Sequence, residues 1–196
     1  TTMLPRLLTD FDPLPGLLKA DCTDFVVDEI PLYPASGEGS HTYFLLEKTG
    51  LATMPAVADL AHHLGVPRHA IGFAGLKDAR AVTRQWMSVE HIEPERLEKL
   101  EIPRLRILET TRHNNKLRQG HLKGNRFQIR VRQTHVQRLA QAQQALTTLC
   151  EKGVPNYFGP QRFGVRGDTG LVGQALLRDD VDDAVDLILG RPSDAD

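Results

Sequence analysis

An aspartate stands among basic residues in GFAGLKDARAVTRQW, the segment at residues 72–86. Asp78 directly follows Lys77 and lies close to Arg80 and Arg84. Nearby cations favour the ionised form of a carboxylate, so Asp78 would carry its charge at neutral pH even if it were partly buried. Aspartate is also common in turns and at helix starts, and this structural origin stays open. The loop is therefore a candidate location for chemistry.

Two further segments combine aromatic rings with amide and basic side chains. LKGNRF at residues 122–127 contains Asn125 and Phe127, and NYFGPQRFG at residues 156–164 places aromatic rings among polar groups. Phe127 belongs to an alternating apolar pattern, which is equally typical of a plain core residue. For the longer segment, the alternative to a binding role is a buried structural turn.

Several common catalytic signatures are absent from the sequence. It contains no GxxxxGK[ST] loop, no GxGxxG after a strand, no HExxH and no GxSxG. His62 and His63 are adjacent rather than four residues apart, so on a helix their imidazoles would point to different sides. Cys22 and Cys150 lack the spacing of metal ligands. We therefore expect no metal site.

The charge of the chain is balanced in total but uneven in distribution. The 196 residues carry 24 Lys and Arg against 25 Asp and Glu, with 40% hydrophobic residues, as in an ordinary globular protein and unlike a disordered or fibrous one. Between Arg104 and Arg138, however, ten basic residues face a single acid, Glu109. Such a cationic stripe is typical of contact with a polyanion. A solvated face paired with the acidic segments is the alternative.

Hydrophobic periodicity and turn residues predict the elements that would position these segments. The strands expected are 24–30, 42–47, 71–74, 85–89, 105–111 and 126–132, and the helices are 55–64, a stretch from Thr134 to Gly153, 171–177 and 181–189. This order predicts an α+β fold with a mainly antiparallel or mixed sheet. Helices from about Pro55 and about His135 would cover one face and leave a cationic cleft on the other. With no apolar run of about 20 residues and no signal-peptide pattern, we expect a cytoplasmic protein.

The three segments at residues 72–86, 122–127 and 156–164 resemble the signature regions of the TruD family of pseudouridine synthases. A fourth segment, from Lys19 to Glu29, is similar to the opening motif of that family. The four occur in the order of the family and span residues 19–164, and a nine-residue match such as NYFGPQRFG is far more specific than a lone GxGxxG.

The resemblance implies an isomerase that converts a uridine of transfer RNA, in bacterial members the uridine at position 13, to pseudouridine without a cofactor or a metal. The nucleophilic aspartate of the family falls on Asp78, which is chemically reasonable because an ionised carboxylate can attack or deprotonate the sugar. The substrate-binding positions that the resemblance indicates are Lys19, Asn125, Phe127, Asn156, Phe158, Gln161 and Arg162. The expected contacts to the RNA backbone are Lys77, Arg80, Arg84, Lys116, Arg118 and Lys123. Transfer RNA is the expected partner, and a monomer the expected state.

Members of the family continue past the third motif into an inserted domain and then return to complete the catalytic sheet. We therefore expect residues 1–165 to be part of the catalytic domain, and residues 166–196 to begin the inserted domain. Two other hypotheses stay open. The chain could be a truncated, non-catalytic RNA-binding protein, or an unrelated interaction protein with a basic patch.

Overall fold

The computed structural model describes residues 14–154 and 166–190, and the chain divides into two compact units. One unit is Leu14–Val136, and the other contains Gln137–Asp196. Each unit is described by itself. The boundary expected at residue 165, between the catalytic domain and the inserted domain, is a different division from this one, and it stays a prediction.

A mixed sheet of six strands forms the centre of the first unit. In spatial order its strands are β5 (Leu105–His113), β2 (His41–Thr49), β4 (Val82–Glu90), β1 (Phe25–Pro31) and β6 (Leu122–Ile129), with β3 (Gly72–Phe73) paired to β4. Within the described residues β1 and β4 run parallel, and the other pairs are antiparallel. The α+β class and the mixed sheet are confirmed.

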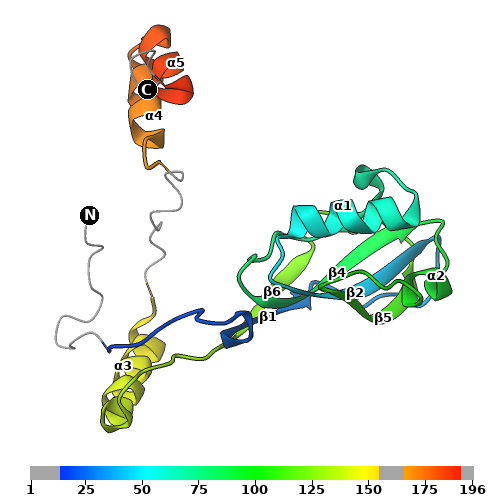
Figure 1. Ribbon diagram of the computed structural model, residues 1–196, viewed down its shortest axis with the longest axis horizontal. Helices are drawn as coiled ribbons and strands as arrows, with labels where there is room; N and C mark the ends of the chain where they lie inside the picture. Colours follow the sequence, from blue (N-terminus) through cyan, green and yellow to red (C-terminus); the bar gives the residue numbers. More distant parts are fainter. Residues whose placement is uncertain (1–13, 155–165, 191–196) are drawn as a thin grey trace. The chain divides into compact units, whose positions relative to one another are not determined.

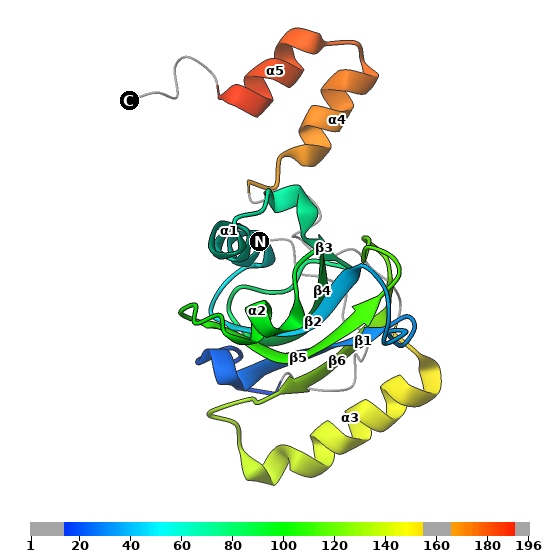
Figure 2. The same cartoon turned by 90° about the vertical axis from the view of Figure 1, so that its right-hand side faces the viewer.

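One face of this sheet is covered by helix α1 (Thr53–Leu64), which Figure 1 shows lying along the strands and Figure 2 shows nearly end-on. The helix ends at Gly65, whose φ of 65° is a left-handed conformation that glycine adopts without strain. The short helix α2 (Pro94–Glu98), which the sequence patterns did not predict, buries Leu97 in the same core. Fully buried apolar side chains from α1 and the two central strands make up this core: Phe44, Leu46, Val57, Leu60, Leu64, Met87 and Val89.

Short 3-10 helices connect several elements: η1 (Cys22–Asp24), η2 (Arg68–Ala70) and η3 (Val136–Arg138). The second unit contains α3 (Leu139–Lys152), α4 (Thr169–Leu177) and α5 (Val181–Leu189). Helices α4 and α5 pack on each other and bury Ala175 and Ala184. The expected coverage of the sheet by a helix from about His135 stays a prediction, because α3 belongs to this second unit.

Strand β6 differs from the expected strand at residues 126–132. It runs from Leu122 to Ile129, and its Phe127 and Ile129 are about half exposed, at 53% and 51%. The reason is position: β6 is the outermost strand in spatial order among the described residues, whereas the buried core centres on β2, β4 and α1. The alternative reading of Phe127 as a plain core residue is therefore wrong for the described part of the chain.

A buried ion pair holds the loop between β3 and β4. Lys77 Nζ lies 2.5 Å from Glu29 Oε2 on β1, with the two side chains 4% and 1% exposed. The other carboxylate oxygen of Glu29 accepts a hydrogen bond from the backbone N–H of Trp86 on β4. The backbone N–H of Lys77 donates to Thr53 Oγ1 at the start of α1. The residue directly before Asp78 is thus tied to two strands and a helix.

Lys48, near the end of β2, anchors the same loop through its backbone carbonyls. Its buried ammonium donates to the carbonyl oxygens of Leu51 at 2.6 Å, Asp78 at 2.7 Å and Lys77 at 3.4 Å. Burial lowers the pKa of Lys48 to about 8, while the charge of Asp78 opposes this change. An ammonium that binds three carbonyls closes the turn around Asp78 without occupying its carboxylate.

We expect either single replacement of the buried pair, Glu29→Gln or Lys77→Met, to lower the free energy of unfolding by about 3–5 kcal/mol, because each leaves an unpaired polar or charged group in the interior. The double variant Glu29→Gln/Lys77→Met should recover much of this loss. Urea denaturation of the four proteins measures both effects. Additive losses in the double variant would show that the two side chains do not stabilise the loop as a pair.

Lys48 predicts a specific pH dependence of stability. Its pKa is about 8 in the folded protein against 10.5 ordinarily, so between these values the unfolded chain binds more protons than the folded one. The free energy of unfolding contributed by this group should therefore rise with pH across that window, by on the order of 1–3 kcal/mol. Denaturation at about pH 8 and about pH 10 should show a larger rise in the native protein than in Lys48→Met. Equal rises in both would contradict the assignment.

Candidate active site

Lys19 and Asp78 form an ion pair at the surface of the loop between β3 and β4. Lys19 Nζ lies 3.3 Å from Asp78 Oδ1, and the side chains are 30% and 49% exposed. Asp78 is therefore open to a substrate while one ammonium remains in contact with it. Lys19 itself has a φ of 54°, which is uncommon for a residue with a side chain. Such conformations persist where the surrounding structure holds them, and they cluster at functional sites.

Two phenylalanine rings extend this site along the sheet. Lys19 Nζ sits 3.8 Å from the ring centroid of Phe25, the first residue of β1. The ring of Phe25 in turn lies 5.8 Å from that of Phe127 on β6, at an interplanar angle of 59°. The cation, the carboxylate and the two rings are therefore continuous, although they come from segments almost 110 residues apart in sequence, from Lys19 to Phe127.

Asn125 lies on the same face of β6 as Phe127, because side chains two residues apart on a strand point the same way. Its register partner on β1 is Glu29, the residue whose carboxylate binds Lys77. The pairing of β1 with β6 thus places Asn125 beside Glu29, one member of the ion pair that positions Asp78. Asn125 is exposed, so its donors and acceptor are accessible.

These groups suit the chemistry of a flat, polar ring attached to a sugar. An exposed aromatic ring can stack on the ring, an amide can bond its edge, and an exposed carboxylate can act on the sugar as nucleophile or base. Phe127 has no hydroxyl, so it can stack but cannot transfer a proton. Within the described residues, no group of three or more His, Cys, Asp or Glu side chains is arranged to hold a metal ion.

Two of the residues expected to contact the RNA backbone are engaged inside the protein. The ammonium of Lys77 is buried against Glu29. The Arg84 guanidinium donates hydrogen bonds to the carboxylates of Glu47 at 2.8 Å and Asp28 at 2.9 Å. These bonds raise the pKa of Arg84, and the bond to Glu47 has the larger effect. In this geometry the guanidinium is already shared between two carboxylates, and Lys77 is inaccessible to a phosphate. Lys77 thus supports the Asp78 loop, whereas Arg84 is 37% exposed and its contact with RNA stays a prediction.

The other expected backbone contacts reach the surface. Arg80, Arg118 and Lys123 are exposed, and no partner of their side chains is found within the described residues. Lys116 donates a hydrogen bond to the carbonyl of His69 and is partly exposed. These four remain available for phosphate contact, which stays a prediction.

The cationic stripe is also partly neutralised within the fold. The carboxylate of Asp24 is fully buried, accepts a hydrogen bond from Arg132 Nε at 2.7 Å and lies 3.9 Å from Arg130. The bond from Arg132 holds the pKa of Asp24 below its ordinary value. Arg106 and Arg112 pair with acids in the same way. The expected alternative, pairing with acidic segments, thus holds for part of the stripe.

Four expected substrate-binding residues, Asn156, Phe158, Gln161 and Arg162, lie outside the described residues. The structure in turn adds three that the sequence patterns did not single out: Phe25, Glu29 and Lys48. One signal for Glu29 was available, since it stands at an inward position of the alternating strand Phe25, Val27, Glu29. A carboxylate at such a position needs a buried partner, and the sequence does not say which cation provides it.

No helix in the described ranges, 14–154 and 166–190, is long and apolar enough to span a membrane.

Comparison with known proteins identifies the family of the chain. A family model described as tRNA pseudouridine synthase D (TruD) matches residues 4–196. A curated tRNA pseudouridine synthase D from Geobacter metallireducens is 48% identical over 178 residues, covering 91% of this chain and 44% of that protein. The enzyme of the same name from Thermus thermophilus is 46% identical over 176 residues, covering 89% and 49%.

A solved structure assigned to TruD from Methanosarcina mazei superposes with a TM-score of 0.77 at 34% identity. It covers 94% of this chain and 43% of the other. The chain thus spans about half the length of the relatives it matches. With the family model matching nearly all of its residues and the fold shared with a solved member, the chain belongs to the tRNA pseudouridine synthase D (TruD) family.

Proposed function

We propose that the protein to which this chain belongs isomerises a uridine of transfer RNA, at position 13, to pseudouridine, with Asp78 as the reacting carboxylate. The observation that supports this most strongly is the continuous group of Asp78, Lys19, Phe25 and Phe127, in which an exposed carboxylate lies beside a stacking platform. We further propose that it acts as a monomer in the cytoplasm and uses no cofactor.

The reaction requires the base to leave the stack and to stay bound after it is detached. The C1′–N1 bond breaks, the uracil turns within the pocket, and C1′ bonds to C5, after which C5 loses its proton and N1 gains one. Asp78 either attacks C1′ or removes the proton at C2′, and both routes need its negative charge. Phe127 would stack on the turning ring while Asn125 bonds its edge, which keeps a free base in place.

Positioning of the carboxylate is the contribution of the fold. Lys48 binds the carbonyl of Asp78, and the Lys77–Glu29 pair holds the preceding residue. The carboxylate itself contacts Lys19, whose positive charge is already in place beside the reacting group. Preorganised charges of this kind do not have to reorient during the reaction.

Asp78→Asn should abolish pseudouridine formation while leaving transfer RNA affinity within about twofold, because asparagine keeps the shape and hydrogen bonding but has no charge or comparable nucleophilicity. Release of tritium from C5-labelled uridine, measured with the full-length protein, reports turnover. Asp59→Asn on α1 is the matched control and should release tritium at the native rate. Substantial release by Asp78→Asn would return Asp78 to the role of a turn aspartate. No release by the native protein would favour the non-catalytic RNA-binding hypothesis.

Phe127→Ala should weaken transfer RNA binding and also lower turnover, since loss of one base-stacking contact costs about 1–3 kcal/mol. Ile129→Ala is the control, because Ile129 is equally exposed and lies on the same face of the strand. Fluorescence anisotropy gives the affinity, and tritium release gives the rate. If the two variants behave alike, the effect is general loss of apolar surface, and Phe127 does not stack on the target base.

A further inference from the structure

A second cleft lies on the face of the sheet opposite α1. Neighbouring side chains of a strand point to opposite faces, so His41 and Tyr43 of β2 face away from Phe44, which packs in the α1 core. This cleft has a volume of about 750 Å³. It is lined by side chains of the segment before β2, of β2 itself and of the loop that joins β5 to β6: Tyr33, Pro34, His41, His113, Asn114, Asn115, Lys116, Arg118 and His121.

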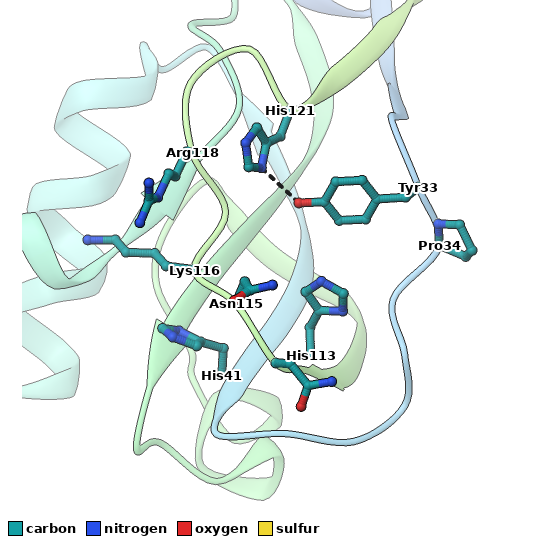
Figure 3. A pocket seen from close by; sticks show the side chains of 9 residues that line it. Tyr33, Pro34, His41, His113, Asn115, Lys116, Arg118 and His121 are labelled. Atoms are coloured by element: carbon teal, nitrogen blue, oxygen red, sulfur yellow. Dashed lines mark hydrogen bonds between the residues drawn. The ribbon is translucent and has the colours of Figure 1, made fainter.

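Contacts between aromatic side chains hold the walls of the cleft in place. The Tyr33 hydroxyl and His121 Nδ1 are hydrogen-bonded at 2.7 Å, which Figure 3 shows as a dashed line. Tyr33 stacks on His113 with 5.4 Å between ring centroids, and Tyr43 lies 4.7 Å from the same imidazole. The loop is also held closely against β3, because a Cβ on Gly72 would stand 2.3 Å from the carbonyl oxygen of Leu117.

Two cations from the same loop stand at one side of the cleft. Figure 3 shows Lys116 and Arg118 extending away from Tyr33, on the other side of the loop from His113. No hydrogen bond or ion pair of the Arg118 side chain is found within the described part of the chain. Lys116 donates one hydrogen bond to a carbonyl, and its ammonium has two more protons to donate. An anion at this position would accept hydrogen bonds from both the guanidinium and the ammonium.

An apolar recess of about 340 Å³ continues from the cleft and shares Tyr33 and His121 with it. Tyr43 and Trp86 add aromatic surface there, and Glu109 adds a carboxylate. The hydroxyl of Tyr43 is an independent sign of a ligand. It is buried, Tyr43 being 4% exposed, and within the described residues no group completes a hydrogen bond of ordinary geometry to it, although the Tyr33 hydroxyl lies close enough to help burial raise the pKa of Tyr43. A buried hydroxyl without a partner is costly, and a polar group entering the recess would satisfy it.

The cleft is separate from the candidate active site. Glu29 and Lys48, which support the Asp78 loop, lie at positions of β1 and β2 that share the α1 face. His41 and Tyr43 lie on the opposite face of the same sheet. One nucleotide therefore cannot occupy both places.

We propose that this cleft binds a second, unpaired nucleotide of the RNA substrate, with its base in the aromatic recess and its phosphate between Arg118 and Lys116. The proposal rests on the proposed function for the identity of the polymer. Aromatic surface beside a cationic rim is how proteins bind single-stranded RNA: the base stacks, and the phosphate meets the cations. An inorganic anion would use the rim but would leave the recess and the Tyr43 hydroxyl unfilled. The hydrogen-bonding groups of a base edge match the carboxylate of Glu109 and this hydroxyl.

The test uses the full-length protein carrying Asp78→Asn, so that transfer RNA binds without turnover. Tyr33→Leu and Arg118→Gln should each raise the Kd for transfer RNA about tenfold, the size expected for one stacked base or one phosphate contact. Arg118→Gln should also lower the slope of log affinity against log salt by about one, whereas Tyr33→Leu should leave it unchanged. In proteins that retain Asp78, KM should rise about tenfold with kcat unchanged.

Two controls make the result specific. Lys99→Gln removes an exposed cation next to α2 and should change the Kd by less than about twofold. Tyr33→Phe keeps the stacking ring and loses the bond to His121, so its Kd should rise by less than that of Tyr33→Leu. Thermal unfolding checks that each variant folds. If Tyr33→Leu does not fold, a Kd and salt slope of Arg118→Gln equal to those of Lys99→Gln still overturn the proposal.

Native affinity in both Tyr33→Leu and Arg118→Gln would overturn the proposal. Weaker binding in Arg118→Gln with native binding in a folded Tyr33→Leu would also overturn it, because the cleft would then hold a phosphate but no base. These outcomes are distinct from failure of the proposed function. A native protein that binds transfer RNA through the cleft but forms no pseudouridine would refute the catalytic role of Asp78 and leave the cleft assignment standing.

Discussion

The buried ion pair between Glu29 and Lys77 is the interaction on which the site depends. A charge in the interior is tolerated only with a partner, so the pair fixes the loop before β4 against β1 at one point. Lys48 and Thr53 then bind backbone groups of the same loop. With one side chain of the loop and two of its backbone groups held in this way, the turn presents the carboxylate of Asp78 outward. The cost of burying the two charges is offset by their mutual attraction and by the hydrogen bond from Trp86, and the pair gives the neighbouring Asp78 a defined position.

The outermost strand of the sheet in the described residues also contributes to the site. Strand β6 lies at the border of the core, and this position leaves Phe127 about half exposed beside Phe25. An exposed ring is unfavourable in water, but it is what a stacking partner for a base requires. The two faces of the sheet carry different features. The α1 face carries the core and the Asp78 loop, and the opposite face carries a cleft of aromatic and cationic side chains.

Local patterns were enough to predict most elements of the fold. Helix α5 matches the expected range at both ends, and α1 and β5 begin or end within two residues of expectation. Periodicity is a local signal in all three, and the two helices are also followed by a glycine. Strand β6 was placed too late in the chain, since the alternation of Phe127, Ile129 and Val131 indicates a strand but does not say where its hydrogen bonds to β1 end. The five-residue helix α2 was missed because so short a segment shows no periodicity.

By itself the sequence determined the candidate residues Asp78, Lys19, Asn125 and Phe127, because each belongs to a motif that can be recognised within one short segment. It also indicated the class of the fold. Tertiary structure alone decided which cations remain for a substrate. Lys77, Arg80 and Arg84 all lie within six residues of Asp78 in sequence, yet the parallel pairing of β1 with β4 brings the carboxylates of β1 to Lys77 and Arg84 and leaves Arg80 exposed. Strand pairing joins residues some fifty positions apart, and no local pattern encodes which partners will meet.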